Sequence, residues 1–479
     1  MKDTIPHNDH NPADEAASAS RPAQWTIRFK TWRKRVMSDF VFMIVLAVIV
    51  GFLAGVATHI FRWLIGFVSG FFLPHIRQDS PNWWLILTPV CGFVITGFFT
   101  RNIIRTNLMH GAAQLMGDLR KKAYRLRRNI TFSPVIGGSI TLGFGGSAGA
   151  EGPIAYTGAA IGSNVGQLFG LKPEMLKVLI GCGAAAGISG IFMSPIGGML
   201  FTVELLRMSL GTISFIAVLL SCLVSYGVVF MLHGCTLHNP YTPIETLSPS
   251  LYCPVILLGV FCGFYSLYYS SVINCMDSIY KRIKNPLLRN TIGGLAVGTA
   301  LMLFPSLYGA GYEVIGNVIH GNYDAIYNGS LLKLFDLGKL GLIAAAIGIL
   351  LIKCFATGST NSSGGVAGDF APTLFSGCIA GFLFATVSNQ YLGTEFPVRI
   401  FAFLGMAGLM SGAIEAPLMT VFIVRDLGLS YEYILPICLC SFTSYLTVKG
   451  MSRLAGFDQR MILHLKWFIH KYEFHNGTK

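Results

Sequence analysis

The sequence predicts an all-α polytopic membrane protein, built as an inverted-repeat bundle of tilted and broken helices. Three observations lead to this fold class. First, the chain of 479 residues is 53% hydrophobic and only 12% charged, whereas about 25% of the residues of a soluble domain are charged. Second, long uncharged windows recur along the chain. Third, a glycine-rich pattern of fourteen residues occurs twice, 219 positions apart.

Six uncharged windows are each long enough to cross the hydrocarbon core of a bilayer, which takes about 20 residues. These windows are residues 129–150, 152–171, 178–203, 208–244, 250–276 and 370–394. Shorter windows at 340–352 and 400–414 indicate tilted or half-crossing helices. The 55 glycines indicate that many helices are interrupted or closely packed.

Basic residues cluster beside the hydrophobic windows, around residues 28–35, 120–128 and 281–289. The positive-inside rule places these clusters and the N-terminus in the cytoplasm, and we expect the chain to be a multi-pass protein of the inner (plasma) membrane. The net charge of +13 therefore reflects topology, and no nucleic-acid partner is expected. The expected segments are a disordered basic cytoplasmic tail at 1–38, a first membrane repeat at 39–235, a loop at 236–250, a second repeat at 251–466 and a C-terminal tail at 467–479.

The fourteen-residue pattern aligns residues 145–158 with residues 364–377. In each copy a glycine-rich turn is followed by a proline and an apolar run, which predicts extended backbone leading into the first turn of a helix. Paired breaks of this kind at matching places in two halves mark the binding site of transporters built from repeats.

A second match supports the repeat, because residues 186–195 correspond to residues 407–417 at an offset of 222. Each copy is a turn of small residues, then a helix that begins with proline. An acid follows the proline by nine residues, Glu204 in one copy and Asp426 in the other.

Helix starts carry a partial positive charge and unpaired N–H groups, so they can bind an anion without a full positive charge. The expected donors are backbone amides at the two breaks, namely those of Gly149, Ala150, Gly152, Asp369, Phe370 and Ala371. The alternative is that these glycines only allow helices to pack closely. We expect no cofactor and no metal, and the cysteines behave as small hydrophobic residues.

Glu151 is the most informative single residue, because it lies at a predicted helix start within an apolar stretch. A carboxylate there mimics the anion and can occupy its site, while protonation releases it. The alternative is an ordinary helix-start acid stabilised by the helix dipole.

These motifs resemble the CLC family of chloride channels and proton/chloride exchangers, in a minimal prokaryotic form. The resemblance is carried by Glu151-Gly152-Pro153, by residues 183–187 with Pro195, by residues 364–372 and by the tract 431–436. It implies roughly 18 helices in an inverted repeat, a homodimer with one pore per subunit, and chloride or a related anion as substrate. It also implies that Glu151 is the gate.

The sequence departs from the family pattern at both ends of the expected anion site. Ala150 replaces the arginine that usually precedes the gating glutamate. His110 falls where the family has a serine that contacts the anion, and we leave open whether it donates to the anion or is structural. The C-terminal tyrosine that contacts chloride is not evident, since its position falls on Phe457 or Gln459 depending on the alignment.

The internal glutamate that passes protons in exchangers is also missing, because its position falls on Leu205 and the acid beside it is Glu204. These departures favour a passive or weakly proton-coupled chloride channel, gated by voltage or pH. The alternatives are a proton-coupled Cl⁻/H⁺ antiporter and a fluoride-selective relative. We do not expect an enzyme, because no catalytic grouping is recognisable, and a cation transporter would need several acids at the breaks.

Overall fold

A computed structural model of the chain describes residues 35–77, 82–106, 108, 111–122, 124–209, 211–233, 248–331, 333 and 338–454. These residues form sixteen α-helices with short 3₁₀ and π segments, and they contain no β-strand. Eight helical segments in this part of the chain are long and apolar enough to cross a membrane. The predicted all-α membrane fold is confirmed.

The first half contributes eight helices. They are α3 (Asp39–Ser69), α4 (Thr88–Phe98), α5 (Gly111–Arg120), α6 (Ser133–Gly143), α7 (Glu151–Leu168), α8 (Pro173–Phe192), α9 (Pro195–Leu200) and α10 (Thr212–Leu232). The second half contributes eight more. They are α11 (Tyr252–Lys281), α12 (Pro286–Leu303), α13 (Tyr312–Ile319), α14 (Gly338–Ser362), α15 (Phe370–Tyr391), α16 (Val398–Ile414), α17 (Pro417–Asp426) and α18 (Ile434–Leu454).

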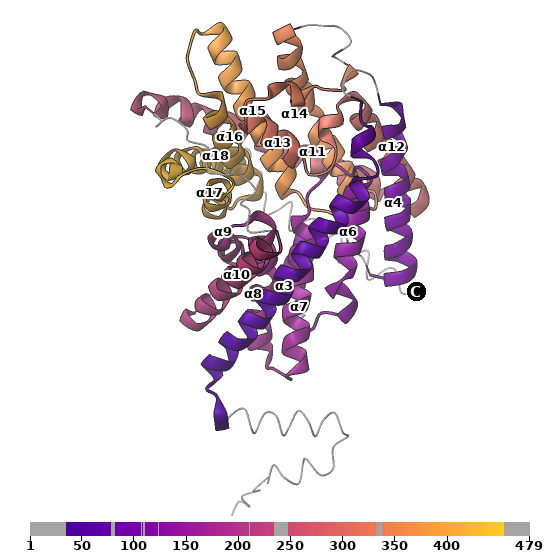
Figure 1. The fold of residues 1–479 in the computed structure, drawn as a ribbon, viewed down its shortest axis with the longest axis vertical. Coiled ribbons are helices and arrows are strands. Elements are labelled where there is room, and N and C mark those ends of the chain that lie inside the picture. Colours follow the sequence, from indigo (N-terminus) through magenta and orange to yellow (C-terminus); the bar gives the residue numbers. More distant parts are fainter. Residues whose placement is uncertain are drawn as a thin grey trace, which may run out of the picture.

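The two halves repeat the same packing. In the first half α3 packs against α6, α8 and α10, and in the second α11 packs against α14, α16 and α18. Likewise α7 packs along α8 as α15 packs along α16. In Figure 1, α3 and α7 to α10 of the first half lie in the lower part of the molecule, α15 to α18 of the second half lie at the upper left, and α4 of the first half lies beside α12 of the second half at the right.

The helices that follow the breaks, or pack against them, lie in the interior. Within the most apolar window of α8, 83% of the residues are buried, and for α15 the figure is 78%. For α10 and α18 it is only 33%, so these helices present apolar side chains outward, as a lipid-facing helix does. The repeated motifs therefore lie inside the protein, away from its lipid-facing surface.

Glycine is required by backbone conformation at the same place in both copies of the long motif. Gly145 has φ +92° and Gly364 has φ +128°. Residues with a Cβ rarely adopt these conformations, so both turns depend on glycine.

Two expectations about the windows were wrong. Window 129–150 is not one span, because α6 ends at Gly143 and the rest is the turn that leads to Glu151. Window 340–352 is not a short helix, because α14 continues for 25 residues through Lys353, which is buried within the protein. Window 400–414 does form a short helix, the 17 residues of α16.

Candidate functional site

The two glycine-rich breaks meet in the middle of the molecule. Gly149 and Gly368 form an isolated antiparallel bridge, in which each N–H donates to the other residue's carbonyl at 2.8 Å. Two residues later α7 begins at Glu151 and α15 begins at Phe370. The predicted helix starts are therefore confirmed, and both point their first N–H groups into one region.

The close approach of the breaks explains their glycine content. A Cβ at Gly368 would lie 2.8 Å from the backbone nitrogen of Gly152, and one at Gly149 would lie 1.9 Å from Oε2 of Glu151. Any larger residue at 368 would thus push the two backbones apart. At 149 it would instead collide with the Glu151 side chain, which folds back over its own helix start.

Glu151 is only 1% exposed and lies between the two helix starts. Its Oε1 accepts a hydrogen bond of 3.3 Å from the Tyr312 hydroxyl of α13. Oε2 is buried and has no hydrogen bond of normal geometry within the described residues. The backbone N–H groups of Glu151 and Ala371 are close enough to stabilise the carboxylate charge. A carboxylate in this position uses the same donors that an anion would use.

A buried lysine of the second half forms a hydrogen bond with this region. Lys353 of α14 has no exposed surface, and its Nζ donates to Ser147 Oγ at 2.8 Å, within the turn that leads to Glu151. The same Nζ lies 3.4 Å from the carbonyl of Gly309, 3.5 Å from that of Leu307, and 4.7 Å from the centre of the Phe375 ring. The Lys353 amino group is thus buried beside the break, where oxygen acceptors and an aromatic face surround it.

Leu205 is packed among apolar side chains. It ends the π-helical segment Phe201–Leu205 that continues α9, and it packs against the main hydrophobic core. On the same segment Phe201 meets Phe370 with 6.1 Å between ring centroids. The position that carries the internal glutamate in exchangers is therefore occupied by a packed apolar side chain.

Glu204, the neighbouring acid, instead accepts hydrogen bonds from the start of α17, a helix of the other half. Its carboxylate accepts hydrogen bonds from the backbone N–H groups of Leu418 (3.1 Å) and Met419 (2.7 Å) at the start of α17. These groups have no partner within their own helix, so Glu204 caps α17.

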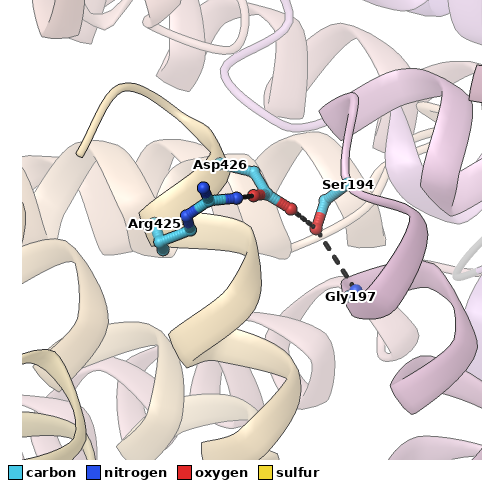
Figure 2. A network of polar contacts seen from close by, with 4 residues as sticks. All are labelled: Ser194, Gly197, Arg425 and Asp426. Carbon is cyan, nitrogen blue, oxygen red and sulfur yellow. Dashed lines mark hydrogen bonds and ion pairs between the residues drawn. The ribbon is translucent and has the colours of Figure 1, made fainter. Parts of the chain in front are cut away.

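The equivalent acid of the second half, Asp426, contacts the start of α9 in the first half. Asp426, at the end of α17, accepts a hydrogen bond of 2.5 Å from Ser194 Oγ, which itself accepts from the Gly197 N–H at the start of α9 (Figure 2). Arg425 pairs with Asp426 and stacks 3.5 Å from the centre of the Tyr431 ring. Glu204 and Asp426, matched in the sequence by their offset, thus each contact the helix start of the other half, Glu204 directly and Asp426 through Ser194, which caps α9; we call this pair of contacts the reciprocal cap.

Comparisons with known proteins agree with this geometry. A family model described as voltage gated chloride channel matches residues 92–449, most of the chain. The chain belongs to this CLC family. Among curated CLC proteins, a putative chloride channel protein ClcB-like of Ralstonia nicotianae is 26% identical over 424 residues, covering 85% of this chain and 94% of that protein. An H(+)/Cl(−) exchange transporter ClcA of Vibrio parahaemolyticus is 27% identical over 416 residues, covering 82% and 84%.

Solved CLC structures share the fold. A slow cyanobacterial Cl⁻/H⁺ antiporter has a TM-score of 0.68 at 20% identity and covers 85% of this chain and 94% of its own. A CLC-type fluoride/proton antiporter has a TM-score of 0.65 at 20% identity and covers 86% and 96%. At this identity the likeness establishes the CLC fold alone.

The structure gathers most of the site residues expected from the sequence. Around the bridge it brings together Gly149, Ala150, Glu151, Gly152, Asp369, Phe370 and Ala371. His110, Phe457 and Gln459 lie outside the described residues. Sequence reasoning missed Tyr312 and Lys353. Lys353 carries a recognisable signal, because a single lysine interrupts an apolar run that ends at the second break. Tyr312 carries none that we can identify.

Proposed function

We propose that the protein exchanges chloride or a related anion for protons across the membrane, with Glu151 as the gate. The observation that carries this proposal is the position of the Glu151 carboxyl group, buried between the two helix starts and within reach of the Ala371 N–H. A carboxylate there competes with an anion for the same donors. Protonation removes its charge, so an arriving proton and a bound anion favour each other's presence.

The gate works through a small set of groups in this chain. With Glu151 ionised, its carboxylate takes the place of the anion and keeps its hydrogen bond from Tyr312. When Glu151 takes up a proton, the helix starts of α7 and α15 become available to an anion. Lys353 remains hydrogen-bonded to Ser147 and holds the turn that leads to Glu151. Glu151 then loses its proton, and the anionic side chain returns to the helix starts and displaces the anion.

The passive channel favoured by the sequence is the second candidate. It rests on Leu205, which leaves the usual internal proton position apolar. Exchange is better supported because curated relatives at 26–27% identity over more than four-fifths of this chain are named H⁺/Cl⁻ exchange transporters. Two relatives of similar identity, 26% and 28%, carry a channel name instead. The missing glutamate alone does not decide between the two functions.

The test is simultaneous recording of chloride and pH with the purified protein in vesicles that contain more chloride than the bath. Exchange predicts that chloride efflux drives protons inward against their gradient, so the bath becomes alkaline. Chloride efflux without proton movement would support the channel instead, and no anion flux would contradict both. Glu151→Ala is the matched variant, since it should carry chloride but no longer drive protons.

The same proposal includes the anion transported, the membrane in which the protein lies and its oligomeric state. Fluoride is a candidate substrate because one structural neighbour is a fluoride/proton antiporter, and repeating the efflux assay with fluoride tests it. The basic clusters support a plasma-membrane location with a cytoplasmic N-terminus, which labelling of introduced cysteines from each side would check. Family resemblance supports a homodimer, and cross-linking in the membrane tests it.

A further inference from the structure

A second acid lies at the paired breaks, in addition to Glu151. Asp369 follows Gly368 of the bridge, as Ala150 follows Gly149, and the two residues have similar backbone angles (φ −105°, ψ −6° and φ −85°, ψ −9°). The repeat therefore places a carboxylate in one copy where the other has a methyl group. Glu151 is buried, whereas Asp369 is partly exposed. Asp369 thus has access to solvent that the gate lacks in this conformation.

The surroundings of Asp369 are polar and close to the gate. Asn361 of α14 donates a hydrogen bond from Nδ2 to Oδ1 of Asp369. The carboxyl groups of Asp369 and Glu151 are near enough for their charges to interact, and the Tyr269 hydroxyl of α11 interacts with both. Among the described residues, Tyr312 and Lys353 are two further titratable groups that face Glu151.

Two buried hydroxyls near Asp369 are incompletely hydrogen-bonded. Tyr269 is 2% exposed and Thr357 is fully buried; the two hydroxyls adjoin each other, and neither has a hydrogen bond of normal geometry within the described residues. Buried polar groups of this kind are usually satisfied by ordered water. Oε2 of Glu151 is the third such atom in the same region. Polar groups that need water thus lie around both carboxylates.

The position expected for the internal glutamate of exchangers, Leu205, carries no group that can bind a proton. Leu205 is apolar, the Phe201 and Phe370 rings close the space between its segment and α15, and Glu204 is engaged by the start of α17. Within the described residues, Asp369 is therefore the carboxylate that combines partial exposure with proximity to Glu151.

We propose that Asp369 is a second proton carrier, which passes protons between water and Glu151. This inference rests on the proposed exchange function. In the step, the O–H bond of protonated Asp369 breaks and its proton moves through an intervening water. A new O–H bond forms on Oε2 of Glu151. Asp369 is left as a carboxylate that regains a proton from solvent, and the reverse sequence returns the proton.

The test compares Asp369→Asn and Asp369→Glu with wild type in the vesicle assay that records chloride and pH together. Asparagine is nearly isosteric but cannot carry a proton, so we expect the number of protons moved per chloride to fall by about tenfold or more, as for loss of a positioned acid–base group, whatever the change in chloride flux. Asp369→Glu should keep proton coupling. Chloride flux itself reports that each variant is folded.

The outcomes separate this inference from the proposed function. If wild type moves protons and Asp369→Asn moves them equally well, the second carrier is wrong and exchange stands. If Glu204→Gln abolishes proton movement while Asp369→Asn preserves it, the carrier is Glu204 instead. If wild type carries chloride but no protons, exchange itself fails, and the second carrier fails with it.

Discussion

Replacing Gly149 by alanine places a methyl group where the Glu151 carboxyl group lies. The new Cβ would be 1.9 Å from Oε2 and 2.7 Å from both Cδ and Oε1 of Glu151, and these are its three nearest atoms. Ordinary contact begins at 3.4 Å, so Oε2 must move by about 1.5 Å or more. The displaced group is the free end of a side chain, and the backbone bridge to Gly368 can persist.

This displacement should favour the open gate. It breaks the 3.3 Å hydrogen bond from Tyr312 and withdraws the carboxylate from the Ala371 N–H. A hydrogen bond to a charged group contributes about 1.5–3 kcal/mol, which corresponds to a roughly ten- to hundredfold rise in the open population. We therefore expect faster chloride efflux at neutral pH and a flatter dependence of efflux on pH.

The assay is the initial rate of chloride efflux from vesicles at neutral and acid pH. Gly316→Ala is the matched control, because it lies on α13 with Tyr312 and its Cβ would meet nothing within 4 Å. If Gly149→Ala acts through the carboxyl group, it should add nothing in a Glu151→Ala background. An equal acceleration in that background, or a slower efflux in the single variant, would refute the reasoning.

Three further predictions concern the gate, the buried lysine and the reciprocal cap. Glu151→Gln, which mimics the protonated gate, should abolish the rise of chloride efflux that wild type shows as pH falls; a preserved pH profile would rule Glu151 out as the gate. Lys353→Met removes the hydrogen bond to Ser147 and should lower stability by about 0.5–1.5 kcal/mol in thermal unfolding, whereas Lys353→Arg should retain part of it; equal loss in both would indicate a packing role. Glu204→Ala removes the cap of α17 and should cost about 0.5–2 kcal/mol, measured the same way. Asp426→Ala removes the acceptor of the Ser194 hydroxyl while Ser194 still caps α9, and should cost about 0.5–1.5 kcal/mol; wild-type unfolding in either variant would show that its contact does not contribute.

The repeated motifs made part of the site predictable. A glycine-rich turn interrupts a helix, and proline favours the first turn of the next one. The helix starts therefore follow from the sequence alone at four places, namely Glu151, Phe370, Pro195 and Pro417. The partners of these starts do not, since Tyr312 reaches Glu151 across 161 positions of the chain and no local pattern specifies that contact.

The length of α14 was missed for a related reason. A hydropathy window stops at a lysine, because a lysine facing lipid is costly. Lys353 instead faces the protein interior, where the Ser147 hydroxyl and carbonyl oxygens of distant segments receive it. The same holds for Glu204 and Asp426: the sequence showed that they correspond, but only the fold shows that Glu204 caps α17 and that Asp426 bonds to Ser194, the cap of α9.

The bridge between Gly149 and Gly368 has a consequence for biosynthesis. The ribosome completes the first break more than two hundred residues before the second, so Glu151 enters the membrane without the Ala371 N–H and without Tyr312. A first half inserted alone has one helix start and no opposing one, which is not an anion site. The proposed anion site, which needs both helix starts, is complete only when the second half has been made and packs against the first, so we expect a partly synthesised chain to carry no anion.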